Sequence, residues 1–199
     1  MNNTPHTNCL TLRLLHAAKG YKAVAFDIFD TLLKRDCAHP ADLFALMEVT
    51  HQAALGFAEA RVAAEAETRQ TLGREVTLAE IYAHPALRGT DPAAECAAEL
   101  AMIAPNRPVA QAAAACHARG QKVYAVSDMY LPKEQIEAML QKCGLDFLDG
   151  VFVSCEYRVQ KRSGKLFKLF LQQTALRPAE VLFVGDSPRA DFAGAALAG

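Results

Sequence analysis

The segment Val24-Ala25-Phe26-Asp27-Ile28-Phe29-Asp30-Thr31-Leu32 joins a short apolar run to a carboxylate. Residues 22–26 predict a buried parallel strand, because strands covered on both faces are apolar throughout. Asp27 follows this run, so its carboxylate is expected at the mouth of the sheet and not in its core. Taken alone, such an aspartate is as compatible with capping the next turn as with chemistry.

Three further segments predict strands of the same sheet. Residues 122–126 and 181–184 are apolar and end in polar turns, and residues 150–153 form a weaker run of the same kind. Helical stretches separate the later strands, so the alternation predicts an α/β fold with a doubly wound, mostly parallel sheet. Sheets of this type bind ligands at the carboxyl ends of their strands.

A helical insert interrupts the alternation after the first strand. Residues 40–103 contain no convincing strand and are rich in Ala, Glu, Leu and Arg. Pro40 and Pro92 are expected in first helical turns, and Thr77 is expected as an N-cap before Glu80. The predicted helices of the insert span 40–51, 57–70, 77–83 and 92–102. The predicted organisation is an N-terminal arm (1–19), an α/β core (20–36 and 104–199) and an α-helical cap (37–103).

Composition narrows the class of protein. The 199 residues are 52% hydrophobic, and 21 basic against 22 acidic residues give a net charge of −1, which opposes a nucleic-acid binder. The six cysteines are scattered, without zinc-ligand spacing, and indicate reduced thiols. No run reaches the ~18 apolar residues of a membrane span. We therefore expect a cytoplasmic protein without a membrane anchor. We also expect that a further strand of the sheet could follow residue 199 if the chain is one domain of a longer polypeptide.

Polar side chains also follow the other three strands. Ser127 ends the second strand, where its hydroxyl could hold a phosphate oxygen, and Lys161 follows the weaker strand. Asp186 and Asp191 follow the last strand and supply the hard oxygen ligands that Mg²⁺ prefers. Each of these residues has an ordinary structural explanation, as a cap or a solvated lysine. Four elements that each follow a strand, in this order, nevertheless make a specific combination: Asp27, Ser127, Lys161 and the pair of Asp186 and Asp191.

This combination resembles the haloacid dehalogenase-like superfamily, whose four motifs correspond to Asp27–Thr31, Ser127, Lys161 and Asp186 with Asp191. The resemblance implies a Rossmann-like core with an α-helical cap, and Asp27 as a nucleophile that forms an aspartyl-phosphate. It also implies Mg²⁺ as cofactor and positions Ser127 and Lys161 to hold the phosphoryl oxygens. The implied metal ligands are Asp27, the backbone carbonyl of Phe29, Asp186 and Asp191. Further candidate substrate contacts are Thr31, Asp128 and Arg35.

A closer resemblance is to predicted bacterial hydrolases that carry Phe-Asp-Ile-Phe-Asp-Thr-Leu and Ser-Asp-Met-Tyr-Leu-Pro, both present here at residues 26–32 and 127–132. Such hydrolases often accompany or are fused to glycosyltransferases of polysaccharide synthesis. This resemblance implies a small phosphorylated substrate, such as a sugar phosphate, and a glycosyltransferase domain or partner.

Phe29 departs from the superfamily's pattern, which places an aspartate there to protonate the leaving group. Asp30 is the nearest replacement, although it occupies the usual glycine position. An aromatic residue at this position resembles true haloacid dehalogenases, and a catalytically weak domain that binds a glycosyltransferase is a third possibility. Arg61 and Tyr130 could contact a substrate. However, the i,i+4 spacing of Arg61 and Glu65 favours a charged solvent face or a cap-to-core contact.

Overall fold

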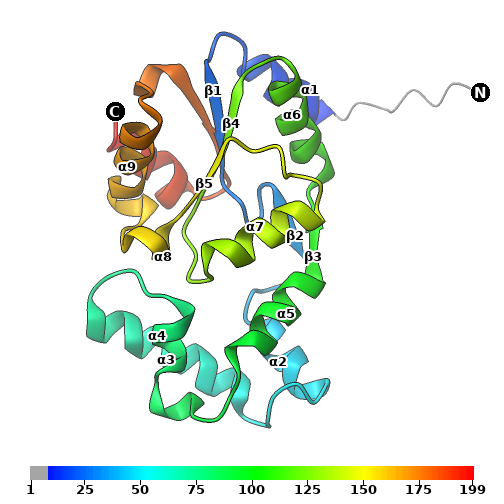
Figure 1. The fold of residues 1–199 in the computed structure, drawn as a ribbon, viewed down its shortest axis with the longest axis vertical. Coiled ribbons are helices and arrows are strands. Elements are labelled where there is room, and N and C mark those ends of the chain that lie inside the picture. Colours follow the sequence, from blue (N-terminus) through cyan, green and yellow to red (C-terminus); the bar gives the residue numbers. More distant parts are fainter. Residues whose placement is uncertain (1–8) are drawn as a thin grey trace, which may run out of the picture.

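The computed structural model describes residues 9–199, which form an α/β lobe and a smaller helical lobe (Figure 1). The α/β lobe is built on a four-stranded sheet in the order β5-β4-β1-β6, and all three strand pairings are parallel. Both the fold class and the parallel sheet are therefore confirmed. The strands of this sheet are β1 (Ala23–Phe26), β4 (Lys122–Ser127), β5 (Gly150–Val153) and β6 (Val181–Val184).

Helices cover both faces of the sheet, and alternate residues of each strand face different cores. Val24 and Val123 pack with α6 (Arg107–Ala118) and α7 (Lys133–Lys142) on one face, whereas Ala25 and Val126 pack with α9 (Lys165–Thr174) on the other. This alternation explains why β1 is buried along its whole length. The helices of this lobe are α1 (Cys9–Ala17), α6 (Arg107–Ala118), α7 (Lys133–Lys142), α8 (Ser154–Tyr157), α9 (Lys165–Thr174) and α10 (Gly194–Ala196).

The helical lobe forms where the sequence predicted a cap and has a core of its own. Thr77 is the N-cap of α4 (Leu78–Tyr82), as predicted. Its hydroxyl accepts from the Glu80 N–H, and the Glu80 carboxylate accepts from the Thr77 N–H, so the two residues form a capping box. Pro92 begins α5 (Pro92–Met102) as predicted. The helices of the cap are α2 (Asp42–Val49), α3 (Phe57–Leu72), α4 (Leu78–Tyr82) and α5 (Pro92–Met102).

The predicted helix start at Pro40 is wrong, because α2 begins at Asp42. Residues 39–42 instead form a turn in which the His39 N–H donates to the Asp42 carboxylate at 2.7 Å and the Asp42 N–H donates to the His39 carbonyl at 3.0 Å. This local hydrogen bonding competes with a further helical turn.

The two chain segments that connect the lobes pair with each other. Strands β2 (Leu33–Arg35) and β3 (Ile103–Pro105) form an antiparallel ribbon, which the sequence did not predict. Helix α1, likewise unpredicted, occupies residues 9–17 of the N-terminal arm and is tied to the start of α6 by a 2.9 Å hydrogen bond from Thr11 to the Pro108 carbonyl. Within residues 9–199, no helix combines the length and apolarity needed to cross a membrane.

Arg61 connects the cap to the α/β lobe from a buried position. Its side chain is 0% exposed, so the solvent-face interpretation is wrong, although its pair with Glu65 is present at 3.1 Å. The guanidinium forms a two-point contact with Glu95 and lies 4.7 Å from the ring centroid of Tyr130 in the α/β lobe. The Tyr130 carbonyl also accepts the Leu78 N–H at 2.8 Å. Arg61 is thus a cap-to-core contact, which agrees with the second interpretation.

Candidate active site

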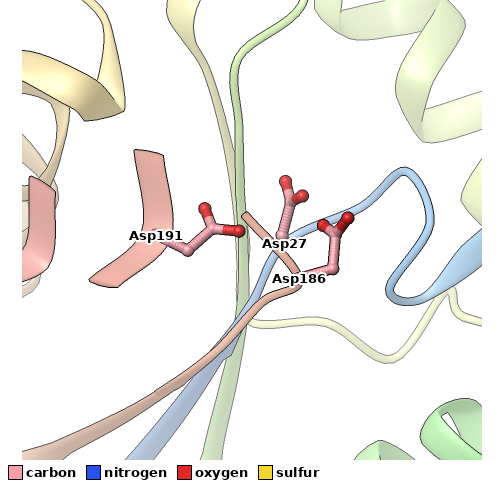
Figure 2. Close-up of side chains that lie close together, drawn as sticks. All are labelled: Asp27, Asp186 and Asp191. Atoms are coloured by element: carbon pink, nitrogen blue, oxygen red, sulfur yellow. The ribbon is translucent and has the colours of Figure 1, made fainter. Parts of the chain in front are cut away.

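Three carboxylates meet at the carboxyl end of the sheet. β1 and β6 pair with Phe26 opposite Val184, so Asp27 and the turn that carries Asp186 leave the sheet side by side. Asp191 approaches from the helical turn Pro188–Ala193, as Figure 2 shows. One oxygen from each carboxylate lies within 4.8 Å of the other two. The segments that end β1 and β6 therefore bring the predicted nucleophile and the predicted metal ligands together.

Lys161 lies against two of these carboxylates. Its ammonium is 2.7 Å from Asp27 Oδ1 and 2.7 Å from Asp191 Oδ1, and the residue is 2% exposed. Burial raises the pKa of Asp27, the charge of Asp191 adds to this effect, and Lys161 opposes it. Burial alone would lower the pKa of Lys161, but the two carboxylates outweigh it and raise that pKa. The lysine thus stays cationic beside the predicted nucleophile.

Two glycines make this close approach possible. A Cβ at Gly185 would lie 2.3 Å from Asp191 Oδ2, and one at Gly194 would lie 2.2 Å from the backbone oxygen of Lys161. The Ser187 N–H then donates to Asp191 Oδ2 at 2.9 Å and fixes the carboxylate. Neither glycine was predicted to be part of the site. Gly185 stands directly before Asp186 at a strand end, a position that could have suggested a close backbone approach.

The other predicted substrate contacts lie on neighbouring segments. Ser127, at the end of β4, is 2% exposed, and its hydroxyl makes no hydrogen bond within residues 9–199. Asp128 Oδ1 accepts the Lys161 N–H at 2.8 Å, which ties the β4 end to the lysine loop. Thr31 Oγ1 lies 3.5 Å from Asp186 Oδ1, and the Thr31 carbonyl accepts from the side chain of Asn106, a residue that the sequence pattern did not indicate.

Phe29, Asp30 and Arg35 lie differently from the residues above. Arg35 stacks over the Phe29 ring at 4.0 Å and forms a two-point contact with Glu99, so its predicted substrate contact would require this pair to break. Asp30 is exposed, has a left-handed backbone (φ 58°) and has no hydrogen bond or ion pair in the part of the chain that the structure describes. Its predicted role as proton donor stays a prediction.

The residues present fit a hard divalent cation. When ionised, Asp27, Asp186 and Asp191 carry three negative charges against the single charge of Lys161, which leaves two in excess. Asp27 Oδ1 and Asp191 Oδ1 are buried and, within residues 9–199, have no hydrogen bond besides the contact with Lys161. Carboxylate oxygens are the ligands that Mg²⁺ prefers. The predicted ligation by the Phe29 carbonyl stays a prediction.

Solved structures with the same fold include enzymes of two activities. An L-2-haloacid dehalogenase from Xanthobacter autotrophicus is 23% identical, with 90% of this chain and 75% of that chain covered and a TM-score of 0.62. A HAD phosphatase from Thermococcus onnurineus is 21% identical (89% and 83% covered, TM-score 0.62). A magnesium-bound HAD hydrolase from Bacillus subtilis is 18% identical (90% and 86% covered, TM-score 0.61).

The family comparison is more specific than these structural similarities. No curated protein matches the chain. The family model for haloacid dehalogenase-like hydrolases, however, matches residues 21–199 and so includes every residue of the site described above. The chain therefore belongs to the haloacid dehalogenase-like hydrolase family.

Proposed function

We propose that this protein is a Mg²⁺-dependent phosphohydrolase that acts on a small phosphorylated metabolite, such as a sugar phosphate, through an aspartyl-phosphate at Asp27. The observation that carries the proposal is the cluster of Asp27, Asp186 and Asp191 with its excess negative charge. A halide-displacing site has no need of three clustered carboxylates, whereas a bound divalent cation would offset the repulsion between Asp27 and an anionic phosphate.

The residues around Asp27 have separable tasks in this proposal. Asp27 attacks phosphorus, and water later hydrolyses the aspartyl-phosphate, which divides one difficult displacement into two easier ones. Lys161, held 2.7 Å from Asp27, offers a positive charge to the phosphoryl oxygens. The Ser127 hydroxyl, which makes no hydrogen bond within residues 9–199, offers them a hydrogen bond. Asp186 and Asp191, together with Asp27, would hold the magnesium ion.

Haloacid dehalogenation is the second candidate, and Phe29 is the observation that favours it. An aromatic residue stands where phosphatases of this family carry an acid, and the structural neighbours include an L-2-haloacid dehalogenase. In that reaction Asp27 would attack carbon and displace halide without a metal. The clustering of Asp186 and Asp191 with Asp27 supports the phosphohydrolase over this alternative.

A partner follows from the sequence resemblance alone. We include in the proposal a glycosyltransferase, as a fused domain or a separate protein, that supplies or uses the phosphorylated sugar. A catalytically weak domain that only binds such a partner is the remaining alternative.

The test is phosphate release from a panel of sugar phosphates, measured with Mg²⁺ and with a chelator, for the wild type and Asp27→Asn. The proposal predicts release that needs Mg²⁺ and disappears in the variant. Halide release from 2-haloacids that persists with the chelator would favour dehalogenation instead. If neither reaction occurs and the protein binds a purified glycosyltransferase, the non-catalytic alternative holds.

A further inference from the structure

Phosphate-ester hydrolysis needs a proton for the leaving oxygen, and position 29 cannot supply one. The phenyl ring of Phe29 has no acidic proton, and the Arg35 guanidinium covers it at 4.0 Å. Arg35 is itself held by Glu99. Asp30 is exposed and makes no contact with the carboxylate cluster or Lys161 that the structure records. A proton donor on another segment is therefore the alternative to Asp30.

Asp128 lies at the same edge of the sheet as the nucleophile. β1 pairs with β4 so that Phe26 lies opposite Ala125, and Asp27 and Asp128 both follow these neighbouring strands at their carboxyl ends. The Lys161 N–H donates to Asp128 Oδ1 at 2.8 Å, and the same lysine reaches Asp27 with its ammonium. Through Lys161, the Asp128 carboxyl is held in a fixed position relative to the site.

Asp128 also lines a cavity of about 470 Å³ between the cap and the strand ends. Gln160, Ser187 and Ala190 line it as well, and each of them is next in sequence to a residue of the site. Arg69 and Glu75 form its cap side. The cavity thus adjoins the residues that would hold the phosphoryl group, and it offers space for the rest of the substrate.

One oxygen of Asp128 is available to this cavity. Oδ1 accepts the Lys161 N–H. Oδ2 has no hydrogen bond within residues 9–199, and it is not enclosed by the surrounding atoms. Glu75, the other carboxyl on the wall, is 2% exposed, and its Oε1 accepts from Arg69 and from the Val76 N–H. Asp128 differs from Glu75 because it is tied to Lys161, the residue that contacts the predicted nucleophile.

The surroundings of Asp128 allow it to carry a proton near neutral pH. Burial raises its pKa to about 6, against the lowering effects of the Lys161 N–H and ammonium, and with smaller raising effects from Glu75 and Asp27. A proton donor works best when its pKa lies near the operating pH. The charged groups that face Asp128 or share its cavity are Asp27, Lys161, Arg69, Glu75, Arg162 and Arg189.

We propose that Asp128 is the general acid that protonates the leaving group, the task that Phe29 cannot perform; this inference rests on the proposed phosphohydrolase function. As Asp27 attacks phosphorus, the bond to the leaving oxygen breaks with its electron pair on that oxygen, which takes the Asp128 proton and departs as an alcohol. In the second step the Asp128 carboxylate takes a proton from water. The water oxygen attacks phosphorus and the bond to Asp27 breaks, which yields phosphate, the Asp27 carboxylate and protonated Asp128.

The test compares two leaving groups in wild type and Asp128→Asn. Asparagine has no acidic proton to donate. The fold should be retained, because the asparagine side chain still accepts the Lys161 N–H. For an alkyl phosphate such as glycerol 3-phosphate, the single-turnover rate of alcohol release should fall by about 10² to 10⁴-fold. For p-nitrophenyl phosphate, whose leaving group needs no proton, the single-turnover burst should change far less. With the alkyl ester, the wild-type rate should fall as the pH rises past about 6, and the variant should lose this dependence.

Two variants serve as controls. Asp146→Asn changes an exposed aspartate that lies outside the site and should leave both rates as in the wild type. Asp30→Asn tests the rival acid. Three outcomes would overturn the role of Asp128. In Asp128→Asn, these are an equal loss of rate with both substrates or no loss of rate with the alkyl ester. The third is a loss of rate with the alkyl ester alone in Asp30→Asn. Absence of phosphate release by the wild type itself would overturn the proposed function and this inference with it.

Discussion

The buried pair of Arg61 and Glu95 should make an unusually large contribution to stability. Both side chains are 0% exposed, and the guanidinium reaches the two carboxylate oxygens at 2.7 and 2.9 Å. Removing one partner leaves the other charge without water or a counter-ion, which typically costs about 3–5 kcal/mol. We therefore expect Arg61→Met to lower the free energy of unfolding by this amount, because methionine fills the space but leaves the Glu95 carboxylate unpaired.

The double variant Arg61→Met/Glu95→Leu separates this explanation from simple loss of packing. It removes both charges, and replacing a buried pair by apolar side chains is often close to neutral. The Tyr82 hydroxyl loses its 2.8 Å hydrogen bond to Glu95 in this variant, which adds about 1–3 kcal/mol of loss. The double variant should thus be more stable than Arg61→Met alone.

Urea unfolding measures these differences, with Lys133→Met as the control. Lys133 forms a partly exposed i,i+4 pair with Glu137 at 3.6 Å, so its loss should change the free energy of unfolding by less than about 0.5 kcal/mol. A change below about 1 kcal/mol for Arg61→Met would refute the reasoning, since that is the range of exposed pairs. A double variant less stable than Arg61→Met would refute it equally.

Three further predictions concern the site and the cap. Lys161→Met should lower kcat for phosphate release by about 10²–10³-fold, because a charge that stabilises the transition state is lost, and steady-state kinetics would measure this. Gly185→Ala should lower the melting temperature and weaken magnesium binding, as its Cβ would lie 2.3 Å from Asp191 Oδ2; calorimetry with MgCl₂ would detect both effects. The pKa of Glu80 is lowered to about 2 by hydrogen bonds, above all from Arg74, so its stabilising effect is complete above about pH 4.5 and disappears toward pH 2. Glu80→Gln should be less stable than wild type by under about 1 kcal/mol at pH 7, and equal to it near pH 2, in urea unfolding at both pH values.

Features that depend on local sequence were predictable. The apolar runs at 150–153 and 181–184 coincide with β5 and β6, because strands buried in a parallel sheet need an apolar run and a polar turn. The cap of α4 depends on Thr77 and Glu80, which are three residues apart, and Pro92 starts α5 as its fixed φ favours.

Features that depend on distant contacts were not predictable in the same way. β2 and β3 have three residues each and are stabilised by pairing across the whole insert, so neither segment has a strand pattern of its own. Arg61 and Glu65 have the spacing of a surface pair, and only the approach of Glu95, 34 residues later, together with the rings around Arg61 shows that the arginine is buried. The tie between Asp128 and Lys161 spans 33 residues and is likewise absent from any local pattern.

The central claim is that Asp27 carries the phosphoryl group during the reaction. Its most direct test is acid quenching of the wild type during turnover of a sugar phosphate that it hydrolyses, in heavy-oxygen water, followed by mass spectrometry of the peptide that contains Asp27. We predict a phosphoryl group on Asp27 that hydroxylamine removes, and heavy oxygen only in the released phosphate. Heavy oxygen in the Asp27 carboxylate, or a phosphoryl group on another residue, would contradict the claim.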